Sequence, residues 1–265
     1  MKECGSMKVQ SRRELISKLV NEQGFASLEF LAEKCGVSTQ TIRRDLQALC
    51  DDNMITRHHG GASPNSSLLN TSYDVRRISL LPEKRELAAE AVRQIAPNRM
   101  LFLSAGSTME VVAQELKKLS SICVLTNNLH AAMHLYREEN IDLFMSCGQV
   151  RKSNGGIVGT NSIDFVSNFR VDYMIMGIGA ISPDGLLLEY DYNEGLLMRR
   201  MMQNANKVIL VTDSTKYERN ATVKVAHLSD VDILVTDQEP PVAIADICSS
   251  NNVRVVIPHG MHEDK

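Results

Sequence analysis

The sequence predicts an α/β protein in two parts, and two observations carry this prediction. In the first 62 residues, short amphipathic helices are followed by a strand that ends in two adjacent glycines. From residue 82 onward, helical stretches alternate with short apolar runs, which is typical of a mostly parallel, doubly wound sheet. We therefore expect a small domain over residues 7–62, a linker over 63–80 that is rich in Ser, Asn and Pro, and a larger domain over 81–259.

The small domain begins with two predicted helices, over residues 12–23 and 27–35. Each repeats apolar residues at the spacing of a helix that packs on one face. The inward positions are Leu15, Ile16, Leu19 and Val20 in the first helix and Leu28, Leu31, Ala32 and Cys35 in the second. The segment Gly36-Val37-Ser38 then indicates a tight turn before a third helix.

The third helix has one apolar edge and one basic edge. Ile42, Leu46 and Leu49 share the apolar edge on a helical wheel, and polar and basic residues lie opposite them. Arg and Gln side chains read base edges, and Ser and Thr hydroxyls contact phosphates. The residues expected to contact DNA from this helix and the turn before it are Ser38, Thr39, Gln40, Thr41, Arg43, Arg44 and Gln47.

A short helix with two arginines is often only a solvated surface, so the flanking elements decide the interpretation. After the third helix, residues 53–61 read as a short strand that closes on two glycines. This order of elements is that of a winged helix-turn-helix, in which Arg57 and His58 would lie on the DNA backbone. We therefore predict binding to double-stranded DNA.

The charge of the chain is modest for such a protein. The net charge is −3, and residues 1–62 hold nine Lys or Arg against eight Asp or Glu. A domain with a net charge of only +1 is unlikely to hold a specific site alone. We expect a homo-oligomer, a dimer or a tetramer, formed mainly by the larger domain and binding repeated half-sites.

Composition also limits the class of protein. No stretch approaches about 18 consecutive apolar residues, and the N-terminus lacks the apolar region of a secretory signal. The six cysteines form no metal-binding spacing and suit a reducing compartment. We expect a cytoplasmic protein with no membrane partner, no metal and no cofactor.

In the larger domain, helices and buried strands alternate. The expected helices cover residues 83–95, 107–119, 128–137, 161–169, 191–205 and 241–250. The expected strands cover residues 100–103, 122–125, 141–145, 173–176, 208–211, 231–235 and 253–257. Together they predict a Rossmann-like sheet, whose ligands lie beyond the carboxyl ends of the strands.

Five of these strands run into polar or glycine-rich segments, namely residues 104–108, 126–128, 146–149, 177–180 and 212–216. Gly106-Ser107-Thr108 precedes a helix, where free backbone N–H groups suit an anion. Alone, this segment can be an ordinary capping turn and Lys216 a surface lysine. As a set, these strand ends predict a site for a small phosphorylated polyol.

The segment from Val37 to Leu46, followed by Ile55 to Ala62, closely resembles the DeoR family of bacterial transcriptional repressors, and the resemblance covers nearly the whole chain. It implies a sensor domain similar in fold to ribose-5-phosphate isomerase that binds a phosphorylated sugar and releases the repressor from the operator of a carbohydrate or polyol catabolic operon. Residues 155–159, 164–172 and 184–194 favour glycerol 3-phosphate as the effector, with a sulfosugar or hexose phosphate as the second possibility.

The resemblance also assigns residues. Gly106, Ser107 and Thr108 match the phosphate loop of the family, and residues 213–216 match its Asp-Ser-x-Lys motif. Ser104 departs from the family, which commonly has Asp two residues before the loop glycine. The expected effector-binding residues are Gly106, Ser107, Thr108, Asn127, Asp172, Glu189 and Lys216.

The main alternative is a sugar-phosphate isomerase with an added DNA-binding domain. Glu189 could serve as the base and Lys216 as the electrophile, but the Lys-Gly-Gly-Gly type of loop found in the isomerase is absent. His130 and His134 lie four residues apart without a third metal ligand. A pure protein-interaction module would not explain the basic face of the third helix. We therefore expect no catalytic residues.

Overall fold

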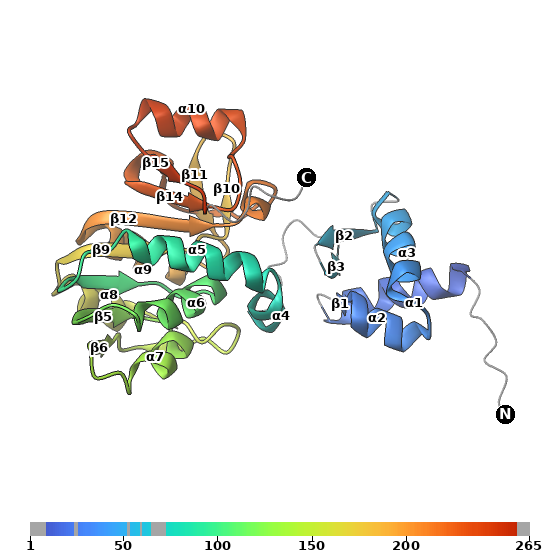
Figure 1. Cartoon of the computed structure of the whole chain (residues 1–265), viewed down its shortest axis with the longest axis horizontal. Helices are drawn as coiled ribbons and strands as arrows, with labels where there is room; N and C mark the ends of the chain where they lie inside the picture. Colours follow the sequence, from blue (N-terminus) through green and yellow to red (C-terminus); the bar gives the residue numbers. More distant parts are fainter. Residues whose placement is uncertain (1–8, 24–25, 52–53, 59, 65–72, 259–265) are drawn as a thin grey trace. The chain divides into compact units, whose positions relative to one another are not determined.

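The computed structural model describes residues 9–23, 26–51, 54–58, 60–64 and 73–258. The chain divides into two compact units, Met1–Ser79 and Leu80–Lys265, each of which has its own hydrophobic core (Figure 1).

The first unit contains the expected helix-turn-helix and wing. Its elements are α1 (Val9–Gln23), β1 (Ala26–Ser27), α2 (Leu28–Cys35), α3 (Thr39–Asp51), β2 (Ile55–His58), β3 (Gly61–Pro64) and α4 (Tyr73–Ile78). Strands β2 and β3 pair antiparallel, and β1 joins the outer side of β3. The inward residues expected for α1 and α2 pack in one core, with Ile16, Val20 and Leu31 fully buried.

Local chemistry sets the turn of the helix-turn-helix. The Ser27 hydroxyl accepts a hydrogen bond from the Phe30 amide at 3.1 Å and caps the start of α2. Gly36 ends α2 in the left-handed conformation, with φ 64°, which glycine adopts without a steric penalty. The Val37 amide then donates to the Ala32 carbonyl at 3.1 Å and closes the turn.

Two details differ from the expected boundaries. Helix α1 begins at Val9, three residues before the expected start. The segment expected as a linker holds Ser63 and Pro64, which pair with β2 in the hairpin, and also helix α4. Proline is tolerated here because Pro64 ends β3, where a missing N–H costs little.

The second unit is built on a seven-stranded parallel sheet in the order β15-β14-β12-β9-β4-β5-β6. Its strands are β4 (Met100–Leu103), β5 (Ile122–Thr126), β6 (Ile141–Met145), β9 (Val171–Met176), β12 (Ala205–Thr212), β14 (Ile233–Thr236) and β15 (Arg254–Val256). Each corresponds to one of the seven expected strands.

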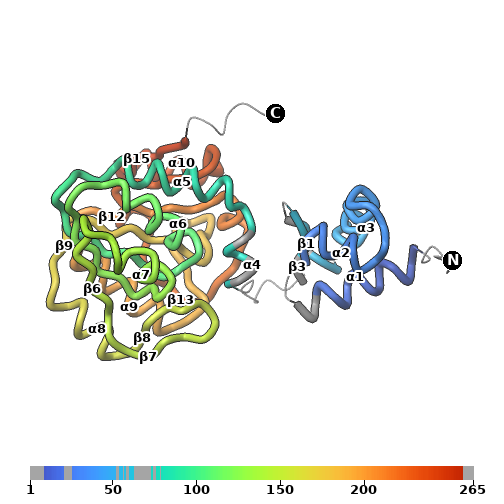
Figure 2. Tube along the Cα trace, turned by 60° about the horizontal axis from the view of Figure 1, so that its bottom comes forward, coloured from blue at the N-terminus to red at the C-terminus, as the bar shows by residue number. Residues whose placement is uncertain are grey.

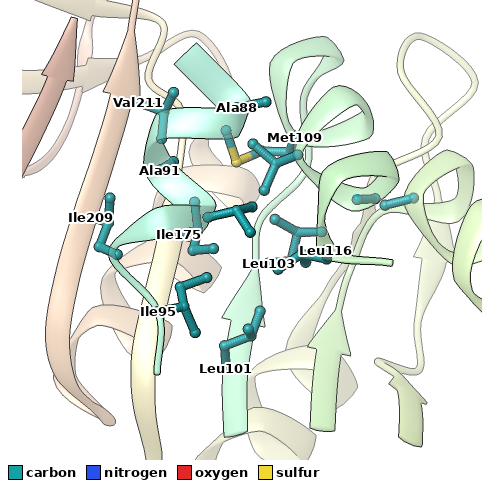
Figure 3. Close-up of a cluster of buried hydrophobic side chains, with 14 of the residues drawn as sticks. Ala88, Ala91, Ile95, Leu101, Leu103, Met109, Leu116, Ile175, Ile209 and Val211 are labelled. Atoms are coloured by element: carbon teal, nitrogen blue, oxygen red, sulfur yellow. The ribbon is translucent and has the colours of Figure 1, made fainter. Parts of the chain in front are cut away.

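Helices cover both faces of this sheet, and Figure 2 follows the chain trace through these helices and strands. One core layer is made with α5 (Leu81–Arg93), α6 (Ser107–Leu116) and α7 (Leu129–Leu135), and Figure 3 shows its side chains meeting those of the strands. The other is made with α8 (Thr160–Ser167), α9 (Tyr192–Gln203) and α10 (Val242–Ser250). Because both faces are covered, the strands are nearly continuous apolar runs, as expected for a parallel sheet.

The second unit also contains short antiparallel strands outside this sheet, which the sequence did not predict. They form a hairpin of β7 (Gln149–Val150) and β8 (Ile157–Val158), and a small sheet of β10 (Ala180–Ile181), β11 (Leu186–Glu189) and β13 (Val223–His227). The remaining elements are two short 3-10 helices, η1 (Ser214–Tyr217) and η2 (Leu228–Asp230).

Candidate functional site

The outer face of α3 is exposed where the sequence predicts DNA contacts. Gln40, Arg43 and Arg44 are exposed, whereas Ile42 and Leu46 are fully buried on the opposite edge. At the start of the helix, the Ser38 and Thr41 hydroxyls lie 3.0 Å apart, and Ser38 accepts the Thr41 amide at 3.3 Å. Ser38 therefore caps the helix that presents these side chains.

The wing is tied to α3 by a contact that the sequence did not predict. The Arg57 guanidinium, on β2, donates to Oε1 of Gln47 at 2.6 Å, and the Gln47 amide donates to Asp51 at 2.8 Å. Gln47 and Arg57 are both exposed, so the pair connects helix and wing along the outer surface. His58 pairs through its backbone with Gly61, and its side chain lies outside the described residues.

A buried ion pair holds α3 against α1. Asp45 is only 3% exposed and accepts hydrogen bonds from Arg12 at 2.6 Å and from Arg13 at 3.2 Å. The hydrogen bond to Asp45 raises the pKa of Arg12 against the opposing effect of burial. Sequence reasoning missed this pair, although the spacing of Asp45 from Ile42 and Leu49 already places it on the apolar edge of α3.

In the second unit, the segment that follows β4 forms a helix start with free N–H groups. Gly106 precedes α6 with φ 133° and ψ 155°, a conformation essentially restricted to glycine, and no side chain caps the helix. Asn128 fixes this turn, because its Nδ2 donates to the Gly106 carbonyl at 3.2 Å while its Oδ1 caps α7. Gly106, Ser107 and Thr108 thus form a held turn at a helix N-terminus, where an anion is favoured.

A buried lysine stands beside this turn. Lys84, on α5, is 4% exposed, and its Nζ lies 3.4 Å from the Ser107 hydroxyl. Sequence reasoning missed Lys84. The available signal was its position one turn before the buried Leu87 and Ala88, which places a lysine on the apolar face of α5.

Lys84 also interacts electrostatically with Asp213, in the segment from Asp213 to Lys216. Asp213 is 5% exposed, and burial alone would raise its pKa. Lys216, the Thr215 hydroxyl, Arg219 and Lys84 together lower the pKa of Asp213 below its ordinary value. The lowered pKa favours the ionised carboxylate of Asp213, with which Lys84, Lys216 and Arg219 all interact electrostatically.

Two buried polar residues directly follow neighbouring strands. Asn127 follows β5 and is 2% exposed, and Ser146 follows β6 and is 3% exposed. Nδ2 of Asn127 donates to the Ile157 carbonyl at 3.2 Å. Oδ1 of Asn127 and the Ser146 hydroxyl are buried without a hydrogen-bond partner. Such groups are costly unless a ligand or water satisfies them.

Glu189 is brought to the same edge of the sheet by β11. Its Oε2 accepts the Tyr190 amide at 3.2 Å and lies 3.1 Å from the position that a Cβ on Gly179 would occupy. Gly179 belongs to the segment that follows β9. Glu189 therefore borders one of the five strand ends from which the sequence predicted the site.

Asp172 is not part of this cluster. It is the second residue of β9, at the amino end of the strand, whereas the other expected residues lie at or beyond carboxyl ends. Its carboxylate accepts the Met100 amide at 3.1 Å and pairs with Arg99 at 3.4 Å. The length of a buried strand separates Asp172 from the other expected residues, so we leave Asp172 out of the proposed site.

Of the two histidines that lie four residues apart, His134 pairs with a glutamate. Nε2 of His134 lies 3.1 Å from the buried carboxylate of Glu110. Within the part of the chain that the structure describes, no three His, Cys, Asp or Glu side chains gather as metal ligands. Among the same residues, no helix has the length and apolar character needed to cross a membrane.

Comparison with protein families covers both units. Residues 12–68 match the DeoR-like helix-turn-helix domain, and residues 81–238 match the DeoR C-terminal sensor domain. The chain belongs to the DeoR family. The fold class expected from the resemblance, a helix-turn-helix domain followed by a Rossmann-like sensor domain, is therefore confirmed.

Named members of the DeoR family match nearly the whole chain. The glycerol-3-phosphate regulon repressor of Escherichia coli is 40% identical over 249 residues, which cover 94% of this chain and 99% of that protein. The repressor of the same name from Haemophilus influenzae is 38% identical, covering 96% and 99%. The transcriptional repressor CsqR of Escherichia coli is 35% identical, covering 93% and 95%. These relatives are named as regulators of transcription, contrary to the enzyme alternative.

Similar solved structures include two other classes of protein. Ribose 5-phosphate isomerase A from Neisseria gonorrhoeae aligns with a TM-score of 0.36 and 15% identity, covering 52% of this chain and 54% of that one. The eIF2B beta subunit from Chaetomium thermophilum aligns with a TM-score of 0.47 and 14% identity, covering 94% and 85%. These distant likenesses concern the fold alone.

Proposed function

We propose that this chain is a transcriptional repressor of a carbohydrate or polyol catabolic operon that a phosphorylated sugar or polyol releases from its operator. The observation that carries the proposal is the exposed basic face of α3, presented by a helix-turn-helix of the DeoR type. The names of the most similar relatives, which are repressors, support the same function.

In this proposal, α3 lies in the major groove. Gln40, Arg43 and Arg44 read base edges, and Gln47 does so while held by Arg57. Ser38, Thr39 and Thr41 contact phosphates at the helix start, and the wing with Arg57 and His58 contacts the backbone. The protein acts in the cytoplasm as a dimer or tetramer, because one small domain of low net charge holds a specific site poorly.

The effector binds at the carboxyl edge of the parallel sheet. Its phosphate accepts hydrogen bonds from the backbone at Gly106, Ser107 and Thr108, and its charge is balanced by Lys84 and Lys216. Asn127 and Glu189 take hydroxyl groups of the ligand. Glycerol 3-phosphate is the first candidate, because two of the relatives described above are named for its regulon.

For release, the effector must bind the conformation that has left the operator more tightly than the operator-bound one. The operator must then weaken effector binding by the same factor, because linkage is reciprocal. An operator sequence selected from random duplexes makes both effects measurable by fluorescence anisotropy. The first ligands to test are glycerol 3-phosphate and glucose 6-phosphate.

The decisive variant is Lys216→Ala, with Lys207→Ala, an exposed lysine at the other end of β12, as its control. The first should bind the operator with near-normal affinity and need far more effector for release. The control should behave as the parent. Release of Lys216→Ala at the parental effector concentration would mean that Lys216 does not contact the effector.

A further inference from the structure

The proposed effector site carries opposite charge on its two sides. On one side, three cations, Lys84, Lys216 and Arg219, interact with Asp213, whose neighbour Ser214 is hydrogen-bonded to a second carboxylate, Asp237. The N-terminus of α6 adds the positive end of its dipole. This side has excess positive charge and suits a phosphate group.

The other side is formed by the β7–β8 hairpin and the start of α9, and its charge is negative. The Arg151 guanidinium pairs with Glu194 at 2.6 Å and with Asp191 at 3.3 Å. The Asn154 amide donates to the other oxygen of Glu194 at 2.6 Å. Two carboxylates therefore meet one cation, and Glu194 is held at 9% exposure.

Gly156 shows that this acidic cluster borders the phosphate turn. A Cβ on Gly156 would lie 3.0 Å from Oε1 of Glu194 and 3.2 Å from Cβ of Ala105, the residue before Gly106. The bare backbone of Gly156 thus fills the narrow space between the carboxylate and the turn. Glu194 therefore faces the phosphate turn across a single residue.

Glu189 adds a third carboxylate, beside the segment that follows β9. Its Oε2 lies beside Gly179, two residues after Gly177. A Cβ on Gly177 would lie 3.9 Å from Cε of Met109, which belongs to the first turn of α6. Glu189 therefore borders the segment that follows β9, and that segment in turn contacts the side chain of Met109 on α6.

The buried oxygen of Asn127 points independently to a ligand and to its chemistry. Oδ1 of Asn127 only accepts hydrogen bonds, and it is buried without a donor. A ligand hydroxyl supplies a donor, whereas an ionised carboxylate or sulfonate supplies none. The Ser146 hydroxyl, also buried without a partner, can bond to a second hydroxyl.

We propose that this site selects a phosphate monoester whose other polar groups are neutral hydroxyls, and that it rejects ligands with a second acid group. This inference rests on the proposed function, because it concerns the effector of the same site. A second acid would meet Glu189, Asp191 and Glu194 in a partly buried setting, where like charges repel strongly. Sulfonated and carboxylated sugar phosphates are therefore excluded as effectors.

The test compares two ligands that differ at one carbon, with calorimetric titration of the full chain. Glycerol 3-phosphate and 3-phosphoglycerate share a three-carbon skeleton and a phosphate, but the second has a carboxylate in place of a hydroxymethyl group. We expect 3-phosphoglycerate to bind at least about tenfold more weakly. Glu194→Gln should reduce this difference, and Glu189→Gln provides a second variant if the first does not fold. Asp142→Asn, an exposed carboxylate near the amino end of β6, is the matched control and should leave it unchanged.

Equal affinity of the parent protein for the two ligands would overturn the selectivity and leave the proposed function standing. The selectivity would also be overturned if both glutamate variants kept the parental difference in affinity between the two ligands, because the carboxylates would then not cause that difference. If neither ligand binds, and glucose 6-phosphate and inorganic phosphate also fail to bind, the proposed phosphate effector is wrong and the selectivity is overturned with it.

Discussion

The two proposed binding surfaces of this protein are built in opposite ways. The α3 side chains that we propose to contact DNA lie within one helix and are exposed, with Gln40, Arg43 and Arg44 less than two turns apart. The effector site gathers residues from Lys84 on α5 to Lys216 on η1, and several of them are buried. The first surface depends on local helix geometry, and the second depends on how distant strands are placed in a sheet.

Because of this difference, substitutions at the two surfaces should affect stability and ligand binding differently. An exposed side chain on α3 can change affinity for DNA without changing the fold, because it makes few contacts within the protein. Residues such as Lys84 and Asp213 are packed in the second unit, so a substitution there acts on folding and on ligand binding together. Four variants, taken from the largest expected effect to the smallest, test the contrast.

Asp45→Ala should have the largest effect, because it leaves Arg12 buried without its carboxylate. Removing one partner of a buried ion pair costs about 3–5 kcal/mol of unfolding free energy. The first unit should melt at much lower temperature, and operator binding should be lost, while the second unit should still bind effector. Calorimetric melting checks both units, with Asp51→Ala, which removes an exposed carboxylate from the same helix, as the control. If Asp45→Ala melted at the parental temperature, the pair of Arg12 and Asp45 would not stabilise the first unit.

Gly106→Ala should lose effector binding at a moderate cost in stability. The conformation at Gly106 is essentially restricted to glycine, so we expect a loss of about 1–3 kcal/mol. Gly159→Ala is the matched control, because Gly159 precedes α8 with φ 119° and ψ 173° and also has open space for a Cβ. Both variants should be strained, but only Gly106→Ala should fail to bind glycerol 3-phosphate by calorimetric titration. Equal loss of binding in both would assign the effect to strain alone.

Arg44→Ala should leave stability unchanged and weaken DNA binding. A base-reading arginine contributes about 1–3 kcal/mol of binding free energy and specificity at one position. Anisotropy titrations with the selected operator and with random duplex at several salt concentrations measure both terms. Arg85→Ala, which removes an exposed arginine from α5, should have no such effect. Unchanged affinities and salt slopes for Arg44→Ala would exclude Arg44 from the DNA contact.

Asp237→Asn should have the smallest effect, and only on the pH dependence of stability. Burial raises the pKa of Asp237, against the hydrogen bonds from the side chain and amide of Ser214. A carboxyl whose pKa is raised on folding binds its proton more tightly in the folded state. Stability therefore falls as the pH rises from the ordinary value, about 3.9, through the raised one, and stays lower above it.

The asparagine variant lacks this proton, so its melting temperature should fall less between about pH 4 and about pH 7. It should also be slightly more stable than the parent near pH 7. Parallel melting curves for the two proteins across this range would show that Asp237 does not contribute to the pH dependence.

The sequence by itself determined the elements that depend on local pattern. The apolar spacing of α1, α2 and α3, the turn at Gly36 and the seven parallel strands follow from helix and strand periodicity. The polar segments after the strands were also expected at one edge of the sheet, the edge of the proposed site, because the carboxyl ends of parallel strands lie there. Asp172 was expected from the family resemblance and not from a strand end, and it lies at the amino end of β9.

Only the tertiary structure decided which polar side chains meet. Lys84 and Asp45 lie on apolar helix faces, where a sequence pattern cannot name the partner that makes burial of a charge tolerable. The β7–β8 hairpin was not predicted because strands of two residues show no periodicity. The ion pair of Arg151 with Glu194, which depends on this hairpin, was therefore not predicted either. The physical reason is common to all of them: periodicity records which side of an element is buried, whereas partners are set by packing between elements far apart in the chain.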